Sequence, residues 1–377
     1  MTEQPRHIVV NSDYAAGKYR HITDQRVIVT GGVGSVGRRI IENLIASDVK
    51  MIRVIDQNES ALFEMEMEFA SRNYGPRLEF FHCDITDERE MRRTFSDMDL
   101  CFHCAALKHV PSCERSPFSA VSVNIEGTEV VGRTAIEAGV KKVIFTSSDK
   151  AVNPTNVMGT SKLMGERLFT AMNFLRSHNT ETIFASTRFG NVLGSRGSVV
   201  PLFCRQIAAG GPITVTDERM TRFVMTMGEA ADLVIESMDL AKGGEVFITK
   251  MPVLRIVDLA RVMIRHIAPL YGHDPEAVEL RITEPRPGEK LWEELSTDEE
   301  ANRLLESDRF LIVMPAGHTK DQREQKYAYD RISASPSDVI YHSDRQPVIG
   351  DDAIWDMLRR EDVLPEDVRA LLAARAN

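Results

Sequence analysis

The chain has 377 residues, enough for one large domain or two smaller ones, and its 43% hydrophobic and 27% charged residues are an ordinary globular composition. The formal net charge of −10 argues against a general nucleic-acid binder and against an anionic-membrane binder, since both need a basic surface. No apolar run approaches the roughly 18 residues that cross a bilayer, and residues 1–7 lack a signal-peptide core, so we expect a cytoplasmic protein.

The first half of the chain alternates between strand-like and helix-like segments. Residues 1–25 are mostly polar and are expected to form an N-terminal arm. From Arg26 on, the predicted strands are 27–29, 51–55, 78–82, 100–103, 142–146 and 183–188, and the predicted helices between them are 38–45, 61–71 and 116–138. This alternation predicts an α/β fold, a Rossmann-type doubly wound parallel sheet with right-handed crossovers, over residues 26–190.

The second half differs from the first: Gly and Pro recur over residues 190–216, and strand-like apolar runs are fewer. We expect residues 191–305 to form a smaller C-terminal substrate-binding lobe that contains a helix near 256–270. A strand near 245–249 is expected to return to the main sheet. Residues 306–377 are assigned to a C-terminal extension, in which 353–360 and 365–374 have the pattern of short amphipathic helices.

The five cysteines (83, 101, 104, 113 and 204) are an odd number without the spacing of a disulfide framework. Cys101 and Cys104 have the outline of a redox or metal pair. However, they lie in a strand-like run that begins at Leu100, where consecutive side chains alternate between faces. Cysteine is often buried, and a metal site would bring further ligands. We therefore predict a buried strand and no metal.

The turn Thr30-Gly-Gly-Val-Gly-Ser-Val-Gly37 stands between a predicted strand and a predicted helix, as a dinucleotide fingerprint requires. Gly31 permits the tight turn, Gly34 permits close approach of a pyrophosphate, and Gly37 permits close packing of helix and strand. The helix N-terminus, from Ser35 and Val36, offers N–H groups and a positive dipole end to phosphates.

Asp56 ends the second predicted strand, where a carboxylate can accept hydrogen bonds from a ribose diol and would repel a 2′-phosphate. Asp56 therefore favours NAD as the cofactor over NADP. Arg53 is close in sequence, so an offsetting positive charge stays open as an alternative.

Ser148, Asp149 and Lys150 follow the apolar run 143–145, and Lys162 comes one helical stretch later. In an open α/β sheet, ligands bind at the carboxyl ends of the strands. A hydroxyl, an acid and a base at that edge indicate acid/base chemistry coupled to redox work. The alternative for Asp149 and Lys150 is an ordinary exposed ion pair.

With these features in place, the chain resembles the UDP-N-acetylglucosamine 4,6-dehydratases, nucleotide-sugar enzymes of the extended short-chain dehydrogenase/reductase family. The resemblance runs from about Arg26 to Glu294. Some relatives carry N-terminal membrane spans that this sequence does not show, so we expect a soluble form. Besides the glycine turn, it rests on A-A-L-K-H-V-P at 105–111, N-I-E-G-T at 124–128, S-S-D-K-A-V-N-P at 147–154, R-F-G-N-V-L-G-S-R-G-S-V-V-P at 188–201, T-V-T-D-E-R-M-T-R-F at 214–223 and R-P-G-E-K at 286–290.

Two positions depart from the wider pattern. The superfamily uses Tyr-x-x-x-Lys, whereas this chain has Met158-Gly-Thr-Ser-Lys162, and methionine cannot transfer a proton. A methionine-bearing subgroup is familiar among the dehydratases, so the loss does not by itself predict a dead enzyme. The other departure is Ser148 in place of threonine, which keeps the hydroxyl.

The resemblance implies a cycle on one bound sugar: oxidation at C4, elimination of water across C5–C6, and return of the hydride to C6. It implies Lys150 as the C5 base, which requires that its pKa fall, and Asp149 as the acid for the departing hydroxyl, in a poorly solvated pocket. Asp149 is also the first candidate to take the C4 hydroxyl proton. Ser148 is expected to bond the C4 oxygen, and Lys162 to hold the nicotinamide ribose.

Binding residues follow from the same resemblance. For the cofactor they are Gly31, Gly34, Ser35, Val36, Gly37, Asp56, Asp84, Ile85, Ala105, Ala106, Lys108 and Lys162. For the nucleotide sugar they are Lys108, His109, Asn191, Ser198, Val199, Val200, Pro201, Arg222, Arg286 and Glu289. Arg222 and Arg286 are expected to clamp the diphosphate, and Glu289 either holds the nucleotide ribose or caps a following helix. Asn124 either positions backbone or packs a helix.

Two other functions stay open. One is a nucleotide-sugar 4-epimerase or dehydrogenase on the same fold, and the other is a non-catalytic NAD-binding regulator. Whether C5 is inverted or retained also stays open. Helices around residues 158–162 commonly form dimers in this superfamily, so the resemblance implies a homo-oligomer that is at least a dimer.

Overall fold

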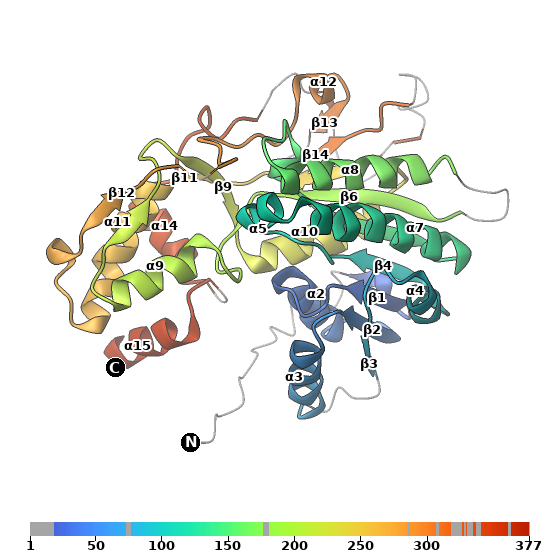
Figure 1. Cartoon of the computed structure of the whole chain (residues 1–377), viewed down its shortest axis with the longest axis horizontal. Coiled ribbons are helices and arrows are strands. Elements are labelled where there is room, and N and C mark those ends of the chain that lie inside the picture. The colour runs from blue at the N-terminus through green and yellow to red at the C-terminus, as the bar shows by residue number, and fades with distance from the viewer. Residues whose placement is uncertain are drawn as a thin grey trace.

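The computed structural model describes residues 19–72, 77–175, 181–285, 287–306, 309–317, 326–327, 329, 335–336, 341–360 and 363–376. Its main sheet has the strand order β15-β13-β14-β10-β6-β5-β4-β1-β2-β3 (Figure 1). Seven of these strands are mutually parallel: β1 (Arg26–Thr30), β2 (Met51–Asp56), β3 (Leu78–His82), β4 (Leu100–His103), β5 (Lys142–Ser148), β6 (Ile183–Phe189) and β10 (Val246–Thr249). The order 3-2-1-4-5-6 is that of dinucleotide-binding sheets, so the predicted Rossmann-type architecture is confirmed.

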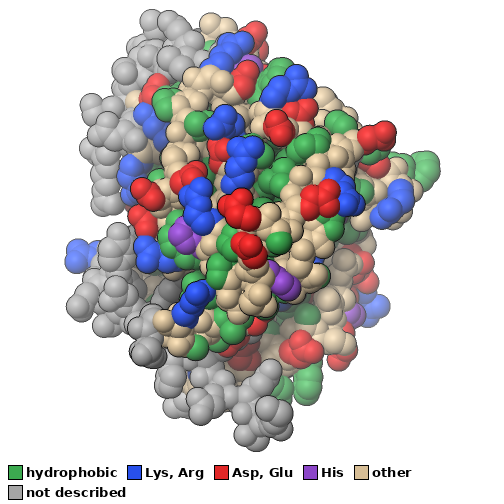
Figure 2. Space-filling view, turned by 90° about the vertical axis from the view of Figure 1, so that its left-hand side faces the viewer, with side chains coloured by type: hydrophobic (Ala, Val, Ile, Leu, Met, Phe, Trp, Pro, Cys, Tyr) green, Lys and Arg blue, Asp and Glu red, His purple; other side chains and the backbone are tan. Residues whose placement is uncertain are grey.

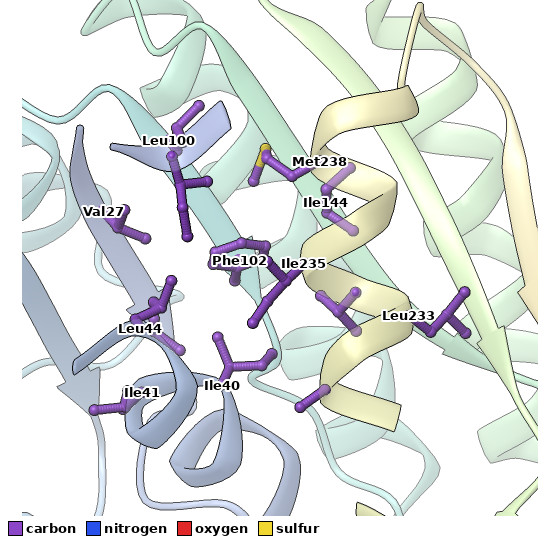
Figure 3. Close-up of a cluster of buried hydrophobic side chains, with 14 of the residues drawn as sticks. Val27, Ile40, Ile41, Leu44, Leu100, Phe102, Ile144, Leu233, Ile235 and Met238 are labelled. Carbon is purple, nitrogen blue, oxygen red and sulfur yellow. The ribbon is translucent and has the colours of Figure 1, made fainter. Parts of the chain in front are cut away.

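Helices cover both faces of this sheet. On one face lie α2 (Ser35–Ile45), α3 (Glu59–Ala70) and α10 (Met227–Leu240), and on the other lie α4 (Glu88–Phe95), α7 (Gly127–Glu137) and α8 (Val157–Met172). Figure 3 shows the first face, where Ile40 and Leu44 of α2, Ile235 of α10 and Phe102 of β4 belong to one buried cluster. All four side chains are fully buried, and each such burial contributes roughly 1.5–3 kcal/mol.

The antiparallel end of the sheet comes from late in the chain. Strand β14 (Phe310–Val313) pairs with β10, β13 (Leu304–Glu306) pairs with β14, and β15 (Ser335–Pro336) pairs with β13. These strands cover the edge that β10 would otherwise expose.

A second hydrophobic core builds the smaller lobe. Two short sheets form it: β7 (Asn191–Val192), β9 (Thr221–Met225) and β11 (Val253–Arg255) in one, and β8 (Ile213–Val215) with β12 (Leu280–Ile282) in the other. The helices α9 (Val199–Ala208), α11 (Ile256–Ile267), α14 (Asp351–Leu358) and α15 (Glu366–Ala376) contribute to this lobe. On the face in Figure 2, the lobe side of the molecule, basic and acidic side chains are interspersed. The domain boundaries at 190/191 and 305/306 stay a prediction.

A buried ion-pair cluster ties β6 to helices on two sides. Arg188 is 1% exposed and donates to both carboxylate oxygens of Glu166 in α8, at 2.9 and 2.7 Å. It also donates to both oxygens of Glu300 in α12 (Asp298–Ala301), each at 2.8 Å, and to the Leu295 carbonyl at 3.1 Å. Every part of the guanidinium therefore has a partner.

Most predicted elements are found within a few residues of their predicted bounds. Strand β5 extends to Ser148, two residues beyond the prediction, and the predicted helix 116–138 is interrupted by a π-helical turn at Ser122–Glu126. All four residues of β4 are buried, as predicted for the segment that carries Cys101. Within the described residues, no helix has both the length and the apolar character that crossing a membrane requires.

Candidate active site

A cavity of about 690 Å³ lies where the carboxyl ends of β1, β4 and β5 face the smaller lobe. Its walls come from the glycine turn, the loop after β4, the end of β5, the start of α8, the segment 189–199, Arg222 and residues 287–293. The predicted site residues that line it are Gly31, Gly34, Ser35, Val36, Gly37, Ala106, Lys108, His109, Ser148, Lys150, Lys162, Asn191, Ser198, Val199, Arg222 and Glu289. The fold thus brings together residues from seven separate segments of the chain.

The glycine turn has the close approaches that its sequence suggests. Gly31 has φ +67°, and a Cβ there would lie 2.6 Å from the Ala105 nitrogen. A Cβ on Gly37 would lie 2.4 Å from the Gly31 carbonyl oxygen. Helix α2 begins at Ser35 without a side-chain cap, so its first N–H groups are available to a ligand in the cavity.

We expect Gly37→Ala to weaken binding of NAD by about tenfold or more, because the added Cβ forces the phosphate-facing turn to shift. Isothermal titration with NAD measures this. Gly228→Ala is the matched control, since a Cβ at that helical position meets nothing closer than 3.7 Å. Equal NAD affinity for Gly37→Ala and the wild type would contradict the expectation.

Asp56 supports the backbone of the glycine turn. Its Oδ2 accepts from the Val33 N–H at 3.2 Å and its Oδ1 from the Asn58 N–H at 2.9 Å. Asp56 is not in the cavity wall, and neither are Asp84, Ile85, Ala105, Asp149, Val200 or Pro201. Asp84 Oδ1 accepts hydrogen bonds from the N–H and the hydroxyl of Thr86. Contact of these residues with a ligand stays a prediction.

Ser148, Asp149 and Lys150 form a compact group at the end of β5. The Ser148 hydroxyl donates to Asp149 Oδ1 at 2.8 Å, and Lys150 Nζ donates to the same oxygen at 3.0 Å. Lys150 Nζ also donates to Asn191 Oδ1 at 3.3 Å. Asp149 is 0% exposed, and its Oδ2 has no hydrogen-bond partner among the described residues. The pair is therefore not an exposed surface pair, and contact of the Ser148 hydroxyl with a substrate stays a prediction.

The pKa of Lys150 differs from the expectation. Burial alone would lower it, but the carboxylates of Asp149 and Glu293 outweigh burial and raise the pKa of Lys150 above its ordinary value. The predicted fall of the Lys150 pKa is therefore not found: Asp149 contributes most to the rise, and Glu293, which the sequence did not reveal, adds to it. Glu293 Oε1 lies 3.6 Å from Lys150 Nζ, in the cavity wall.

Lys162 is the lysine whose pKa is lowered. It is 6% exposed, its Nζ donates to the Thr146 carbonyl at 2.8 Å, and it lies 4.7 Å from the centre of the Phe145 ring. Burial lowers the pKa of Lys162 to about 8. Met158, in the place of the usual tyrosine, is 4% exposed and lines the cavity.

A chain of buried polar groups supports the loop after β4. His103 contacts Thr30 Oγ1 at 2.7 Å through Nδ1 and Thr128 Oγ1 at 3.0 Å through Nε2. Burial and then the Lys162 charge lower the pKa of His103 to about 3, so the ring is neutral. Asn124, in the π-helical turn, is 1% exposed and bonds both the N–H and the carbonyl of Leu107. Of its two predicted roles, backbone positioning is the one these contacts support.

Lys108 and His109 meet the loop that precedes α9. Lys108 Nζ donates to the Arg196 carbonyl at 2.8 Å, and the Arg196 N–H donates to Ser35 Oγ at 3.2 Å. A Cβ on Gly197, which has φ +74°, would lie 2.7 Å from His109 Cε1. This loop therefore bridges the glycine turn and the loop after β4.

Arg222, Arg286 and Glu289 form a further set of predicted substrate-binding residues. Arg222 is 5% exposed and donates to the carbonyls of Thr221, Lys290 and Leu291, so it holds the loop after Arg286. Arg286 itself lies outside the described residues. Glu289 lines the cavity, and the nearest following α-helix starts only at Asp298 with Thr297 as its cap, so Glu289 is not a helix cap.

Glu293 is the site residue that the sequence analysis missed. It is 2% exposed, its Oε1 lies 3.7 Å from Arg222 Nε, and its Oε2 has no hydrogen-bond partner among the described residues. Its only signal in the sequence is its place three residues after Lys290 of the R-P-G-E-K segment.

Relatives with known names include both dehydratases and epimerases. The chain is 35% identical to a UDP-N-acetylglucosamine 4,6-dehydratase (inverting) of Campylobacter jejuni, over 86% of this chain and 94% of that one. It is 37% identical to a UDP-glucose 4-epimerase of Rickettsia canadensis, over 81% and 86%. It is 47% identical to an uncharacterized membrane protein of Methanocaldococcus jannaschii, over 78% and 87%.

Solved structures with the same architecture include Pen from Bacillus thuringiensis, with a TM-score of 0.80 and 39% identity over 89% of this chain and 98% of that one. A dTDP-glucose 4,6-dehydratase of Streptomyces venezuelae, crystallised with NAD, has a TM-score of 0.61 and 22% identity over 71% and 86%, which shows the fold alone. The model of the family described as "Polysaccharide biosynthesis protein" matches residues 27–315. The chain therefore belongs to this polysaccharide biosynthesis family, among the nucleotide-sugar dehydratases and epimerases of the extended short-chain dehydrogenase/reductase kind.

Proposed function

We propose that this protein is a nucleotide-sugar 4,6-dehydratase that converts UDP-N-acetylglucosamine to a UDP-4-keto-6-deoxy-N-acetylhexosamine. The observation that carries the proposal is the Asp149–Lys150 pair at the end of β5, with the lysine reaching a cavity in which Met158 replaces tyrosine. A simple oxidation or epimerisation does not need this pair, whereas elimination of water needs both a base and an acid. The named dehydratase relative supports the same reaction.

The residues present fit a bound NAD. The uncapped start of α2 and the close-packed Gly31 and Gly37 suit a pyrophosphate. Asp56, at the end of β2, suits a ribose diol and disfavours the 2′-phosphate of NADP. When bound, NAD would accept a hydride from C4 of the sugar and return it to C6. We place the nicotinamide ribose near Lys162, whose charge would favour hydride removal.

The residues of the chain divide the remaining work. Asp149 would take the C4 hydroxyl proton and later give it to the departing C6 hydroxyl, with the Ser148 hydroxyl fixing its orientation. Lys150 would remove the C5 proton, and Asn191 would hold its amine toward the cavity. Lys150 must first lose a proton, which its carboxylate neighbours Asp149 and Glu293 oppose. Val199 and Val200, at the start of α9, would present backbone N–H groups to the diphosphate, together with Arg286.

The function is tested by incubating the purified protein with UDP-N-acetylglucosamine and weighing the product. We expect a loss of one water molecule with no net NADH. Proton NMR of the product formed in deuterated water then shows whether C5 is inverted or retained. If the sugar nucleotide is recovered unchanged, the substrate assignment is wrong.

An epimerase is the second candidate, because the Rickettsia canadensis relative carries that name. It predicts an isomeric product of unchanged mass. A non-catalytic NAD-binding regulator is a third possibility, and it predicts that Lys150→Met leaves the cellular role of the protein intact. Met158 argues against the epimerase, since it offers no proton at the position where the superfamily uses tyrosine.

We also propose that the protein acts as a homo-oligomer, at least a dimer, through the face formed by α6 (Pro117–Val121) and α8. Phe118 is 87% exposed, Val121 41% and Met164 45%, and such apolar exposure on neighbouring helices is typical of an interface. Sedimentation of the purified protein tests the oligomeric state. A cytoplasmic location stays a prediction.

A further inference from the structure

Arg222 and Glu293 form a charged pair in the cavity wall beside Lys150. Glu293 Oε1 lies 3.7 Å from Arg222 Nε and 3.6 Å from Lys150 Nζ. Arg222 and Glu293 are both buried, and all three residues line the cavity. The place of this pair therefore determines both the wall that a substrate meets and the charge that surrounds Lys150.

A segment of the predicted C-terminal extension pairs with the backbone on either side of Glu294. The Leu295 N–H donates to the Tyr341 carbonyl at 3.1 Å, and the Ser343 N–H donates to the Glu293 carbonyl at 2.9 Å. The two stretches run antiparallel, with Glu294 opposite His342. The end of the cavity wall is thus held by residues that come 50 positions later in the chain.

The Ser343 hydroxyl joins this wall to β9. It is fully buried and accepts from the Glu293 N–H at 2.9 Å. It also shares a hydrogen bond of 2.8 Å with Thr221 Oγ1 and donates to the Thr221 carbonyl at 3.3 Å. Because Thr221 immediately precedes Arg222, one hydroxyl fixes the backbone next to Arg222 against the backbone of Glu293.

These contacts use the whole hydrogen-bonding capacity of a serine hydroxyl, which has one hydrogen and two lone pairs. An alanine at position 343 would leave the Glu293 N–H and the Thr221 hydroxyl in a buried place without this partner. An unsatisfied buried donor costs more than the hydrogen bond itself contributes. We therefore expect the backbone of Glu293 and the start of β9 to separate when the hydroxyl is removed.

Resting on the nucleotide-sugar function proposed above, we propose that Ser343 is a positioning residue for the substrate site, because its hydroxyl places Arg222 and Glu293 in the cavity wall. The predicted C-terminal extension contributes none of the described wall residues. Its part in the site is therefore indirect, through the backbone that carries this charged pair.

The position of Glu293 has a consequence for Lys150. Burial lowers the pKa of Lys150, the carboxylates of Asp149 and Glu293 raise it, and the Arg222 cation lowers it. A Glu293 that moves away from Lys150 raises this pKa less, so Lys150 loses its proton at a lower pH. The acid limb of the pH–rate profile reports the loss of a proton from the base, and it should then shift to lower pH.

The test titrates the purified protein with UDP and, separately, with NAD, and it records the pH dependence of water loss from UDP-N-acetylglucosamine. For Ser343→Ala we expect UDP binding to weaken by about tenfold and NAD binding to stay within about twofold of the wild type. The glycine turn that faces NAD is shaped by its own contact with Ala105. The acid limb should shift to lower pH by about half a unit or more.

Two further substitutions separate positioning from a general loss of structure. Thr221→Val removes one of the same hydrogen bonds from the other side and should reproduce part of the loss, whereas Thr221→Ser keeps the hydroxyl and should match the wild type. Ser237→Ala is the matched control, because Ser237 of α10 is also fully buried and donates to the Leu233 carbonyl at 2.6 Å. It should change neither UDP binding nor the pH profile.

The outcomes keep the two proposals apart. If the wild type binds UDP but releases no water from the sugar, the dehydratase function is wrong, and the two titrations still decide the role of Ser343. UDP binding by Ser343→Ala within about twofold of the wild type overturns the inference. Equal losses of UDP and NAD binding, or an acid limb of an active enzyme that stays in place, overturn it as well. If thermal unfolding shows that Ser343→Ala is not folded, Thr221→Val takes its place in every measurement.

Discussion

Lys150→Met is expected to lower the rate of water loss from UDP-N-acetylglucosamine by about 10²–10⁴-fold, because methionine keeps the stem of lysine but cannot take the C5 proton. Lys150 is the one member of the pair with Asp149 that lines the cavity, at 26% side-chain exposure. The rate is measured by mass spectrometry of the product, and deuterium uptake at C5 measures the deprotonation itself. We expect both to fall together.

Lys141→Met is the control for this substitution. Lys141 lies at the other end of β5, 59% exposed and paired with Asp99 at the surface. It should leave the rate and the C5 exchange unchanged. A Lys150→Met variant that exchanges C5 as fast as the wild type would show that another group is the base.

Arg188→Met is expected to lower the free energy of unfolding by about 3–5 kcal/mol, because it leaves Glu166 and Glu300 buried without their cation. Denaturant titration measures the change. Arg133→Met is the control, since Arg133 is 49% exposed and its pairs with Glu88 and Glu129 contribute at most about 1 kcal/mol. A change for Arg188→Met no larger than that of the control would mean that the buried cluster contributes little.

The same cluster predicts a pH dependence. Burial would raise the pKa of Glu300, but Arg188 outweighs burial and lowers it from 4.5 to about 2. A carboxyl with a lowered folded pKa stabilises the fold above its unfolded pKa, and this contribution is lost as the pH falls through about 2. The stability gap between wild type and Arg188→Met should therefore be widest near neutral pH. It should narrow as the pH falls below about 5, because the variant's unpaired carboxyls take up protons.

The parallel sheet could be predicted from the sequence because each of its strands is a short apolar run next to a helical period. The same signal failed for β13, β14 and β15, which add antiparallel strands from a region without clear alternation. Within a helix, the presence of an apolar residue does not by itself show that its side chain is buried. Met65 of α3 is 2% exposed, whereas Met67, two residues away, is 57% exposed, so only one of the two packs in the core.

The site was predictable where residues are adjacent in sequence and not where the fold brings distant ones together. The glycine turn, Ser148, Lys150 and Lys162 line a cavity at the carboxyl edge of the sheet, where the sequence predicted the site. Glu293 reaches Lys150 only through the return of a late segment to the end of β5. Its carboxylate adds to that of Asp149 in raising the pKa of Lys150, so the sequence neighbours of Lys150 showed only part of its electrostatic surroundings.

The late arrival of β14 has a consequence for synthesis of the protein on the ribosome. Strand β10 pairs with β6 on one side, but its other edge stays unpaired until Phe310–Val313 have been translated. An open row of backbone N–H and C=O groups invites pairing with other nascent polypeptides. Prematurely terminated products that end before β14 should therefore aggregate through the open edge of β10.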